Sequence, residues 1–79
     1  MTSLEARRAA LRTEIRAALA QYTMPLSVYE LVDHLRRDRA FTRSALVEMS
    51  REGEVETVPD PDNSQRVLYR LAGQKEITL

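Results

Sequence analysis

The sequence has no cysteine and no tryptophan, and only two glycines, three prolines and one histidine among its 79 residues. Without cysteine there can be no disulfide, no thiolate metal site and no cysteine nucleophile. One histidine is too few for a histidine-built metal site within a single chain, and two glycines are too few for the usual phosphate-cradling loop. We therefore expect no bound metal, no cofactor and no enzymatic activity.

Long apolar runs are missing as well. No stretch approaches the roughly 20 residues of a membrane span, and the N-terminus lacks the apolar segment of a signal peptide. Apolar residues make up 43% of the chain and charged residues 30%, a globular mixture that argues against disorder. A chain of this length can bury one shallow core. We expect a single soluble, cytoplasmic domain over residues 1–79.

The net charge is zero, but the charges are unevenly placed along the chain. Residues 1–40 carry seven arginines and five acids, whereas residues 41–79 carry five bases and seven acids. Eleven of the twelve bases are arginine, whose planar fork suits carboxylates and phosphates. A GC-rich genome would produce the same bias, so the arginine content alone does not indicate a function.

Apolar residues recur at helical spacing in two stretches before residue 40, and each stretch follows a start signal. Thr2 with Glu5, and Ser27 with Glu30, have the spacing of capping boxes, in which each side chain bonds the other residue's backbone N–H. The predicted helices span residues 3–21 and 28–36. Their expected inward side chains are Leu4, Leu11, Ile15, Ala18, Leu19 and Tyr22 in the first helix, and Val28, Leu31, Val32 and Leu35 in the second.

A third helix is predicted over residues 42–52, after a polar connector. Thr42 is its expected N-cap, with Phe41 and Leu46 as a hydrophobic staple, and Gly53 lies where a helix C-cap glycine belongs. Such short connectors indicate a helix-turn-helix formed by the second and third helices and braced by the first. The aromatic residues are expected in the core or at its edge: Tyr22, Tyr29, Phe41 and Tyr69.

After the third helix the apolar period changes from about 3.6 to 2, which is typical of β-strands. Strands are predicted over residues 54–58 and 66–71, on either side of a turn-forming segment at residues 60–64. A hairpin wing over residues 54–71 that follows a helix-turn-helix predicts an α+β fold, the winged helix-turn-helix. Residues 72–79 are expected to form a short tail.

The wing also carries a resemblance to a known family. Its sequence runs Gly53-Glu54-Val55-Glu56 and, after two residues and a proline, Asp60-Pro61-Asp62-Asn63-Ser64-Gln65-Arg66-Val67-Leu68-Tyr69-Arg70-Leu71. It resembles the wing of bacterial winged-helix repressors of the MarR (multiple antibiotic resistance regulator) family, and the resemblance covers about residues 24–72. It implies DNA binding. The long flanking helices by which those repressors dimerise have no counterpart here, so we expect a minimal winged helix.

The family's usual wing pattern, Asp-Pro-x-Asp-x-Arg, is only partly present. Asp60 and Pro61 match it, whereas Asn63 stands for the second Asp and Gln65 for the Arg that reaches into the minor groove. Arg66 is displaced by one residue, which on a strand turns a side chain to the opposite face. The resemblance therefore places Gln65 and Arg66 nearest to a wing contact with DNA.

In a helix-turn-helix the second helix of the motif enters the major groove, led by its N-terminal residues. Arg43 can contact a guanine edge and Val47 a thymine methyl group; the alternative is that both belong to an ordinary solvent face. Glu48 opposes DNA binding, because a carboxylate at this position is repelled by the phosphates unless it pairs with a basic side chain such as Arg51. The expected DNA-binding residues are Arg36, Arg37, Arg39, Thr42, Arg43, Ser44, Val47, Arg51, Gln65 and Arg66.

Two functions remain open from the sequence. The first is sequence-specific binding of double-stranded DNA by a small transcriptional regulator of a bacterium, plasmid or phage, acting as a homodimer. The second is a winged helix that contacts another protein in a larger complex, which the acidic residues of the third helix and wing favour. Arginines clustered around Arg43, with the acids turned away, would favour DNA.

Overall fold

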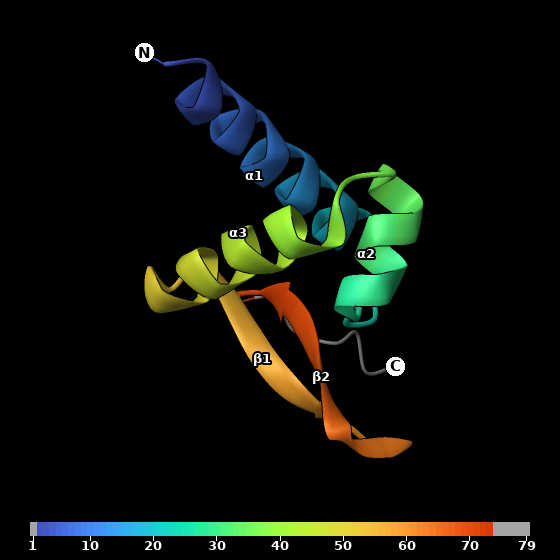
Figure 1. Ribbon diagram of the computed structural model, residues 1–79. Helices are drawn as coiled ribbons and strands as arrows, with labels where there is room; N and C mark the ends of the chain where they lie inside the picture. The colour runs from blue at the N-terminus through green and yellow to red at the C-terminus, as the bar shows by residue number, and fades with distance from the viewer. Residues whose placement is uncertain (1, 74–79) are drawn as a thin grey trace.

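The computed structural model describes residues 2–73, which form three helices followed by a two-stranded antiparallel hairpin (Figure 1). This order confirms the predicted winged helix-turn-helix of the α+β class. The predicted tail lies mostly outside the described residues, at 74–79. The elements are α1 (Ser3–Gln21), α2 (Val28–Leu35), α3 (Arg39–Arg51), β1 (Val55–Asp60) and β2 (Asn63–Leu71).

Both predicted capping boxes are present and set the starts of α1 and α2. The Thr2 hydroxyl accepts from the Glu5 backbone N–H at 3.1 Å, and the Glu5 carboxylate accepts from the Thr2 N–H. The Ser27 hydroxyl accepts from the Glu30 N–H at 3.2 Å, and Glu30 accepts from the Ser27 N–H at 3.0 Å. Each box satisfies two backbone donors that have no partner within the helix, so both helices begin where predicted.

The start of α3 differs from the prediction, because its N-cap is Asp38 and not Thr42. The Asp38 carboxylate accepts from the Phe41 N–H at 2.8 Å. Thr42 is fully buried inside the first turn, and its hydroxyl donates to the Asp38 carbonyl at 2.8 Å. Asp is as strong an N-cap as Thr, and the intervening residues have no helix breaker, so the helix extends back to it. The predicted staple of Phe41 and Leu46 is therefore wrong.

The ends of α2 and α3 are set by residues in the left-handed backbone conformation. Arg36, with φ 54°, ends α2 one residue earlier than predicted. Gly53, with φ 81°, follows α3 as predicted, because glycine adopts this conformation without a Cβ penalty. Its N–H donates to the Ser50 carbonyl at 3.2 Å and the Glu54 N–H to the Met49 carbonyl at 2.9 Å, the hydrogen bonds of a Schellman motif.

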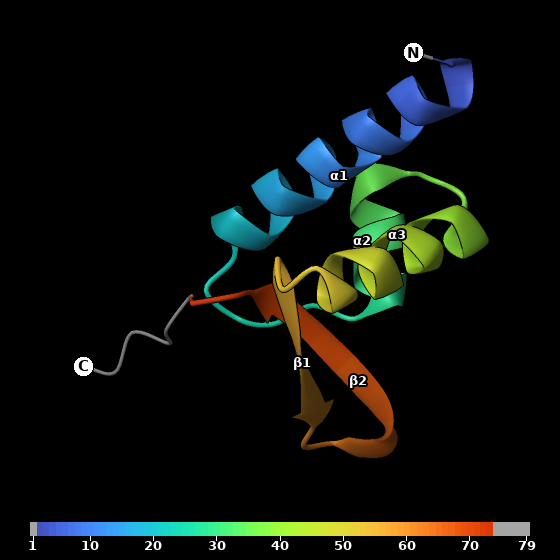
Figure 2. The same ribbon diagram turned by 90° about the vertical axis from the view of Figure 1, so that its left-hand side faces the viewer.

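The core lies where α3 passes between α1 and the hairpin, an arrangement visible in Figure 2. Two residues of the predicted inward stripe of α1 are instead exposed: Leu4 by 49% and Tyr22 by 37%. The N-terminal turns of α1 extend beyond the rest of the molecule (Figure 2), and Tyr22 follows the last helical residue. The buried apolar residues are Leu11, Ile15, Ala18, Leu19, Leu26, Leu31, Ala45, Leu46, Met49, Val55 and Tyr69.

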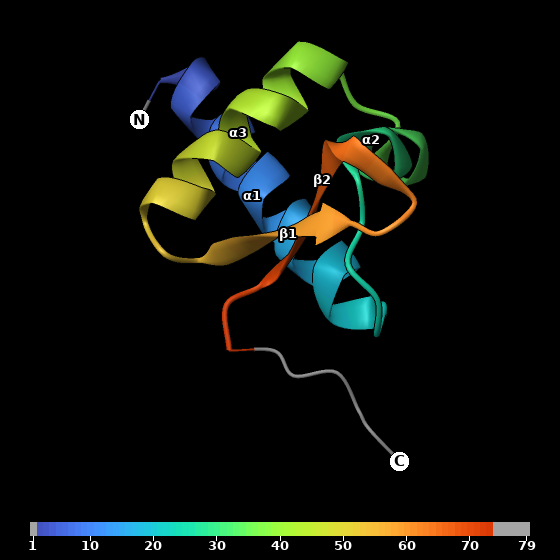
Figure 3. The same ribbon diagram turned by 90° about the horizontal axis from the view of Figure 1, so that it is seen from below.

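The hairpin is longer and its turn tighter than predicted. The strands pair from Val55 opposite Leu71 to Asp60 opposite Asn63, with an irregularity after Pro59, and leave only residues 61–62 in the turn. The short extended segment before α2 also contacts the hairpin, because Leu26 and Tyr69 exchange backbone hydrogen bonds of 2.9 and 2.7 Å. Consequently β2, not β1, lies beside α2, as Figure 3 shows from below.

Candidate nucleic-acid interface

A groove of about 300 Å³ opens between the N-terminal ends of α2 and α3 and strand β2. The Leu26–Tyr69 bridge joins the segment before α2 to β2, and the Schellman motif sets the direction in which the chain leaves α3 for the hairpin. The groove brings together four of the predicted DNA-binding residues, which come from segments far apart in the sequence: Arg39, Arg43, Gln65 and Arg66.

Tyr29 organises this groove and was not predicted to do so. Arg39 Nη2 donates to the Tyr29 hydroxyl at 2.7 Å, and its guanidinium carbon lies 4.5 Å from the ring centroid. The guanidinium carbon of Arg66 lies 5.5 Å from the same ring. Tyr29 is 52% exposed, so its assignment to the core or its edge is wrong. Tyr29 is not among the predicted inward side chains of α2, and this position in the sequence already indicates an exposed ring.

Among the described residues, the arginines of the groove have no acidic partner. Within residues 2–73, neither Arg39, Arg43 nor Arg66 forms an ion pair. All three are exposed. Three guanidinium charges thus converge on one groove, where they are available to an anionic ligand.

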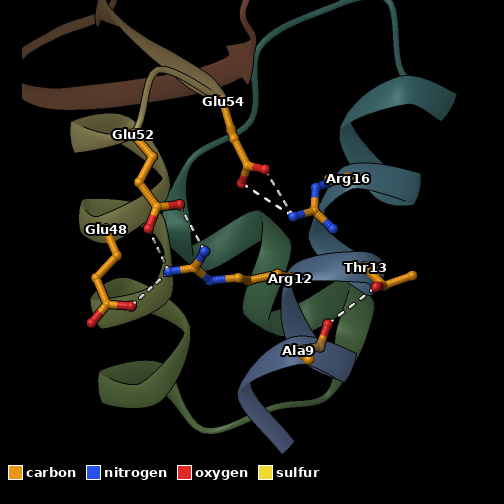
Figure 4. A network of polar contacts seen from close by, with 7 residues as sticks. All are labelled: Ala9, Arg12, Thr13, Arg16, Glu48, Glu52 and Glu54. Carbon is orange, nitrogen blue, oxygen red and sulfur yellow. Dashed lines mark hydrogen bonds and ion pairs between the residues drawn. The ribbon is translucent and has the colours of Figure 1, made fainter. Parts of the chain in front are cut away.

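The acids of α3 and of the segment after it lie on the opposite flank of α3, against α1 (Figure 4). Arg12 Nη1 contacts Glu52 at 2.7 Å, and Arg12 Nη2 contacts Glu48 at 2.8 Å. Arg16 Nη2 contacts the two carboxylate oxygens of Glu54 at 2.9 and 3.2 Å. Glu48 therefore pairs with α1 and not with Arg51. These acids are turned away from Arg43, the arrangement that the sequence analysis named as favouring DNA over a protein partner.

The connector arginines are not part of the groove. Arg37 donates through Nε and Nη2 to Glu14 of α1 at 3.0 and 2.6 Å. This hydrogen bonding lowers the pKa of the Glu14 carboxyl and raises the pKa of Arg37. Arg36 and Arg37 line a separate pocket against α1, next to Phe41. The structure thus separates these two predicted DNA-binding residues from Arg39.

The remaining residues predicted to bind DNA lie partly on the exposed face of α3 and partly on its buried face. Ser44, Val47 and Arg51 are exposed on α3, with Val47 at 38%. Thr42, by contrast, is buried with its hydroxyl already bonded, so it has no surface to offer a phosphate. Thr42 is therefore removed from the candidate interface.

Comparisons with solved structures identify the fold. No family model and no curated protein sequence matches this chain. The structure is similar to the adhesin competence repressor AdcR of Streptococcus pyogenes (16% identity, 80% of this chain and 44% of that chain, TM-score 0.72). It is also similar to PcaV of Streptomyces coelicolor (22%, 92% and 46%, 0.71) and to a variant of MarR from E. coli (25%, 86% and 46%, 0.65).

These neighbours are winged-helix transcriptional regulators of the MarR family, and none is described as an enzyme. The resemblance of the wing to that family is therefore confirmed at the level of the fold. The chain spans about half the length of the regulators it matches. In the described part of the chain, no helix is long and apolar enough to cross a membrane, and no three potential metal ligands cluster.

Proposed function

We propose that this protein binds double-stranded DNA sequence-specifically as a winged-helix transcriptional regulator, with α3 in the major groove. The observation that carries this proposal is the convergence of Arg39, Arg43 and Arg66 on one groove with no acidic partner among the described residues. The fold shared with transcriptional regulators supports it. A phosphate backbone is the ligand that such a cluster of guanidinium groups suits best.

The three arginines have different expected roles. Arg43 lies on the exposed surface of α3 and can direct its fork at the O6 and N7 atoms of a guanine. Arg39 and Arg66 are held against the Tyr29 ring at the entrance to α3 and on β2, where the DNA backbone would pass. We therefore assign base contact to Arg43 and phosphate contact to Arg39 and Arg66, with Ser44, Val47, Arg51 and Gln65 as flanking contacts.

The competing function is contact with a protein partner through an acidic surface. Most of the acids that would form this surface are paired with arginines of the same chain. Glu48, Glu52 and Glu54 pair with arginines of α1, and Glu56 pairs with Arg70 across the hairpin at 3.1 Å. Among the described acids of α3 and the wing, only Asp60 and Asp62, near the hairpin turn, stay outside these pairs. DNA is therefore the better-supported partner.

The test is a fluorescence-anisotropy titration against a duplex from upstream of the protein's own gene and against a random duplex. Arg43→Ala is expected to weaken binding to the cognate duplex by about 1–3 kcal/mol and to change binding to the random duplex little. Arg8→Ala is the matched control, because Arg8 is exposed on α1 and forms no ion pair within residues 2–73. Absence of salt-dependent binding by the unaltered protein would contradict the proposal.

We further propose that the protein binds DNA as a homodimer. One domain with a few phosphate contacts binds weakly, since non-specific dissociation constants are about 10⁻⁴ to 10⁻⁶ M at physiological salt. Two copies on a palindrome place two α3 helices about one helical turn apart. The protruding N-terminal end of α1, where Leu4 is 49% exposed, is a surface available for pairing. Light scattering that detects only the 9.1 kDa monomer at high protein concentration would contradict this.

A further inference from the structure

One arginine of α1 pairs with two acids at the C-terminal end of α3. Arg12 bridges Glu48 of α3 and Glu52, the residue that caps the helix one turn later, and its fork makes contacts of 2.8, 2.7 and 3.3 Å (Figure 4). Its side chain is 21% exposed, against 40% and 51% for the two glutamates. The arginine is therefore the most enclosed member of this network and faces α3, not the solvent.

The position of these acids creates an electrostatic problem for the proposed function. Glu48 lies on the helix that would enter the major groove and Glu52 caps its C-terminal end, five and nine residues beyond Arg43. Unpaired carboxylates repel phosphates over roughly a Debye length, about 10 Å at 0.1 M salt, and a carboxylate at a DNA interface weakens binding unless it meets a cytosine amino group. Pairing with Arg12 offsets this charge and holds both carboxylates on the flank away from the groove.

We propose that Arg12 is a positioning residue for DNA binding, an internal counter-ion that keeps the acidic flank of α3 from repelling the phosphate backbone. The inference rests on the proposed function and adds a residue that does not touch DNA. Arg16 does the same for Glu54 at the base of the wing, with one carboxylate in place of two. The larger effect is therefore expected at Arg12.

The experiment is a double-mutant cycle measured as affinity for a short random-sequence duplex at low salt. Arg12→Gln is expected to lower the affinity about three- to tenfold, because it frees two carboxylates on α3. Arg8→Gln removes the same charge from the same helix, one turn away, but frees no carboxylate, so a clearly smaller loss is expected. In a Glu48→Gln/Glu52→Gln background, Arg12→Gln should cost no more than Arg8→Gln.

The controls separate charge from structure. Arg12→Lys keeps a positive charge beside the carboxylates and is expected to retain most of the affinity, whereas a loss equal to that of Arg12→Gln would overturn the inference. Thermal unfolding by circular dichroism verifies that each variant is folded during the titrations. An equal cost of Arg12→Gln in both backgrounds would also overturn it, while leaving the proposed function intact. If the unaltered protein binds no DNA, both fail.

Discussion

On the flank of α3 that faces α1, Arg12 and Arg16 lie against carboxylates, whereas on the flank that faces β2 the arginines have no acidic partner within residues 2–73. Arg12 and Arg16 belong to the first flank and are held at 2.7–2.9 Å from their closest acids. Arg39 and Arg66 belong to the second, where an aromatic ring and not a carboxylate holds them. One residue type thus has two roles, a structural counter-ion on one side and a candidate ligand-binding group on the other.

This difference shows why a net charge of zero does not argue against DNA binding. Three acids of the C-terminal half lie on one flank and pair with arginines of α1: Glu48, Glu52 and Glu54. Glu56 pairs with Arg70 within the hairpin, so the flank that faces β2 keeps the positive charge of its arginines. What a DNA backbone would meet is the local distribution of unpaired charge and not the total. Both flanks are held in place by the same core, so the largest expected effect is the loss of stability when a core residue is truncated.

Leu46→Ala is expected to destroy both flanks together. Leu46 is completely buried in the core between α1 and the hairpin, and truncating a buried leucine costs about 2–5 kcal/mol of unfolding free energy. A domain of this size has little stability to spare. Denaturant unfolding followed by circular dichroism measures the loss. Val47→Ala, at an exposed position on the same helix, is the control, and a comparable loss there would contradict the assigned core.

Arg66→Gln and Arg16→Gln distinguish the flanks directly through the salt dependence of DNA binding. Arg66 is assigned to a phosphate, so its loss should reduce the slope of log affinity against log salt by about one. Arg16 is engaged by Glu54 and should leave the slope nearly unchanged. The slope is obtained from anisotropy titrations at several salt concentrations. Equal slopes for both variants would mean that the flanks do not differ as proposed.

On the groove side, the ring of Tyr29 lies against two arginines. Tyr29→Leu removes the ring that holds two arginines, and it is expected to weaken DNA binding by about 0.5–1 kcal/mol, the size of an exposed cation–π contact. Tyr29→Phe loses only the hydroxyl that accepts from Arg39, so its effect should be smaller. Tyr22→Leu, at an exposed aromatic residue outside the groove, provides the reference in the same titration. A larger effect from Tyr22→Leu would contradict the role of Tyr29.

The smallest effect concerns pH and the paired arginine Arg37. Its hydrogen bonds lower the pKa of Glu14 in the folded state. A depressed carboxyl pKa contributes stability above the unfolded value of about 4.3, and this contribution is lost as pH falls through the folded pKa. Glu14→Gln should therefore reduce stability slightly at neutral pH and make no difference in strong acid. Melting temperatures measured across this range test it, and a difference that persists in strong acid would contradict it.

The elements that the sequence predicted well are those with signals confined to a few residues. The capping boxes at Thr2 and Ser27 each operate over three residues, and the hairpin follows from a proline- and aspartate-rich turn. The predicted start of α3 is wrong because Asp38 and Thr42 are both good N-caps. Which of them caps the helix depends on whether Thr42 can be buried against the core. That decision is made by packing.

The order of helices and strands, the winged-helix class and the candidates Arg39, Arg43 and Arg66 all followed from the amino-acid sequence. Which arginines are available to a ligand depends on the packing of the helices, because Arg12 and its acids are 36 and 40 residues apart and meet through the docking of α1 on α3. It likewise turned Arg37 toward Glu14 and exposed Tyr29 between two arginines. Secondary structure follows from neighbouring residues, whereas the pairing of charges follows from how the elements pack.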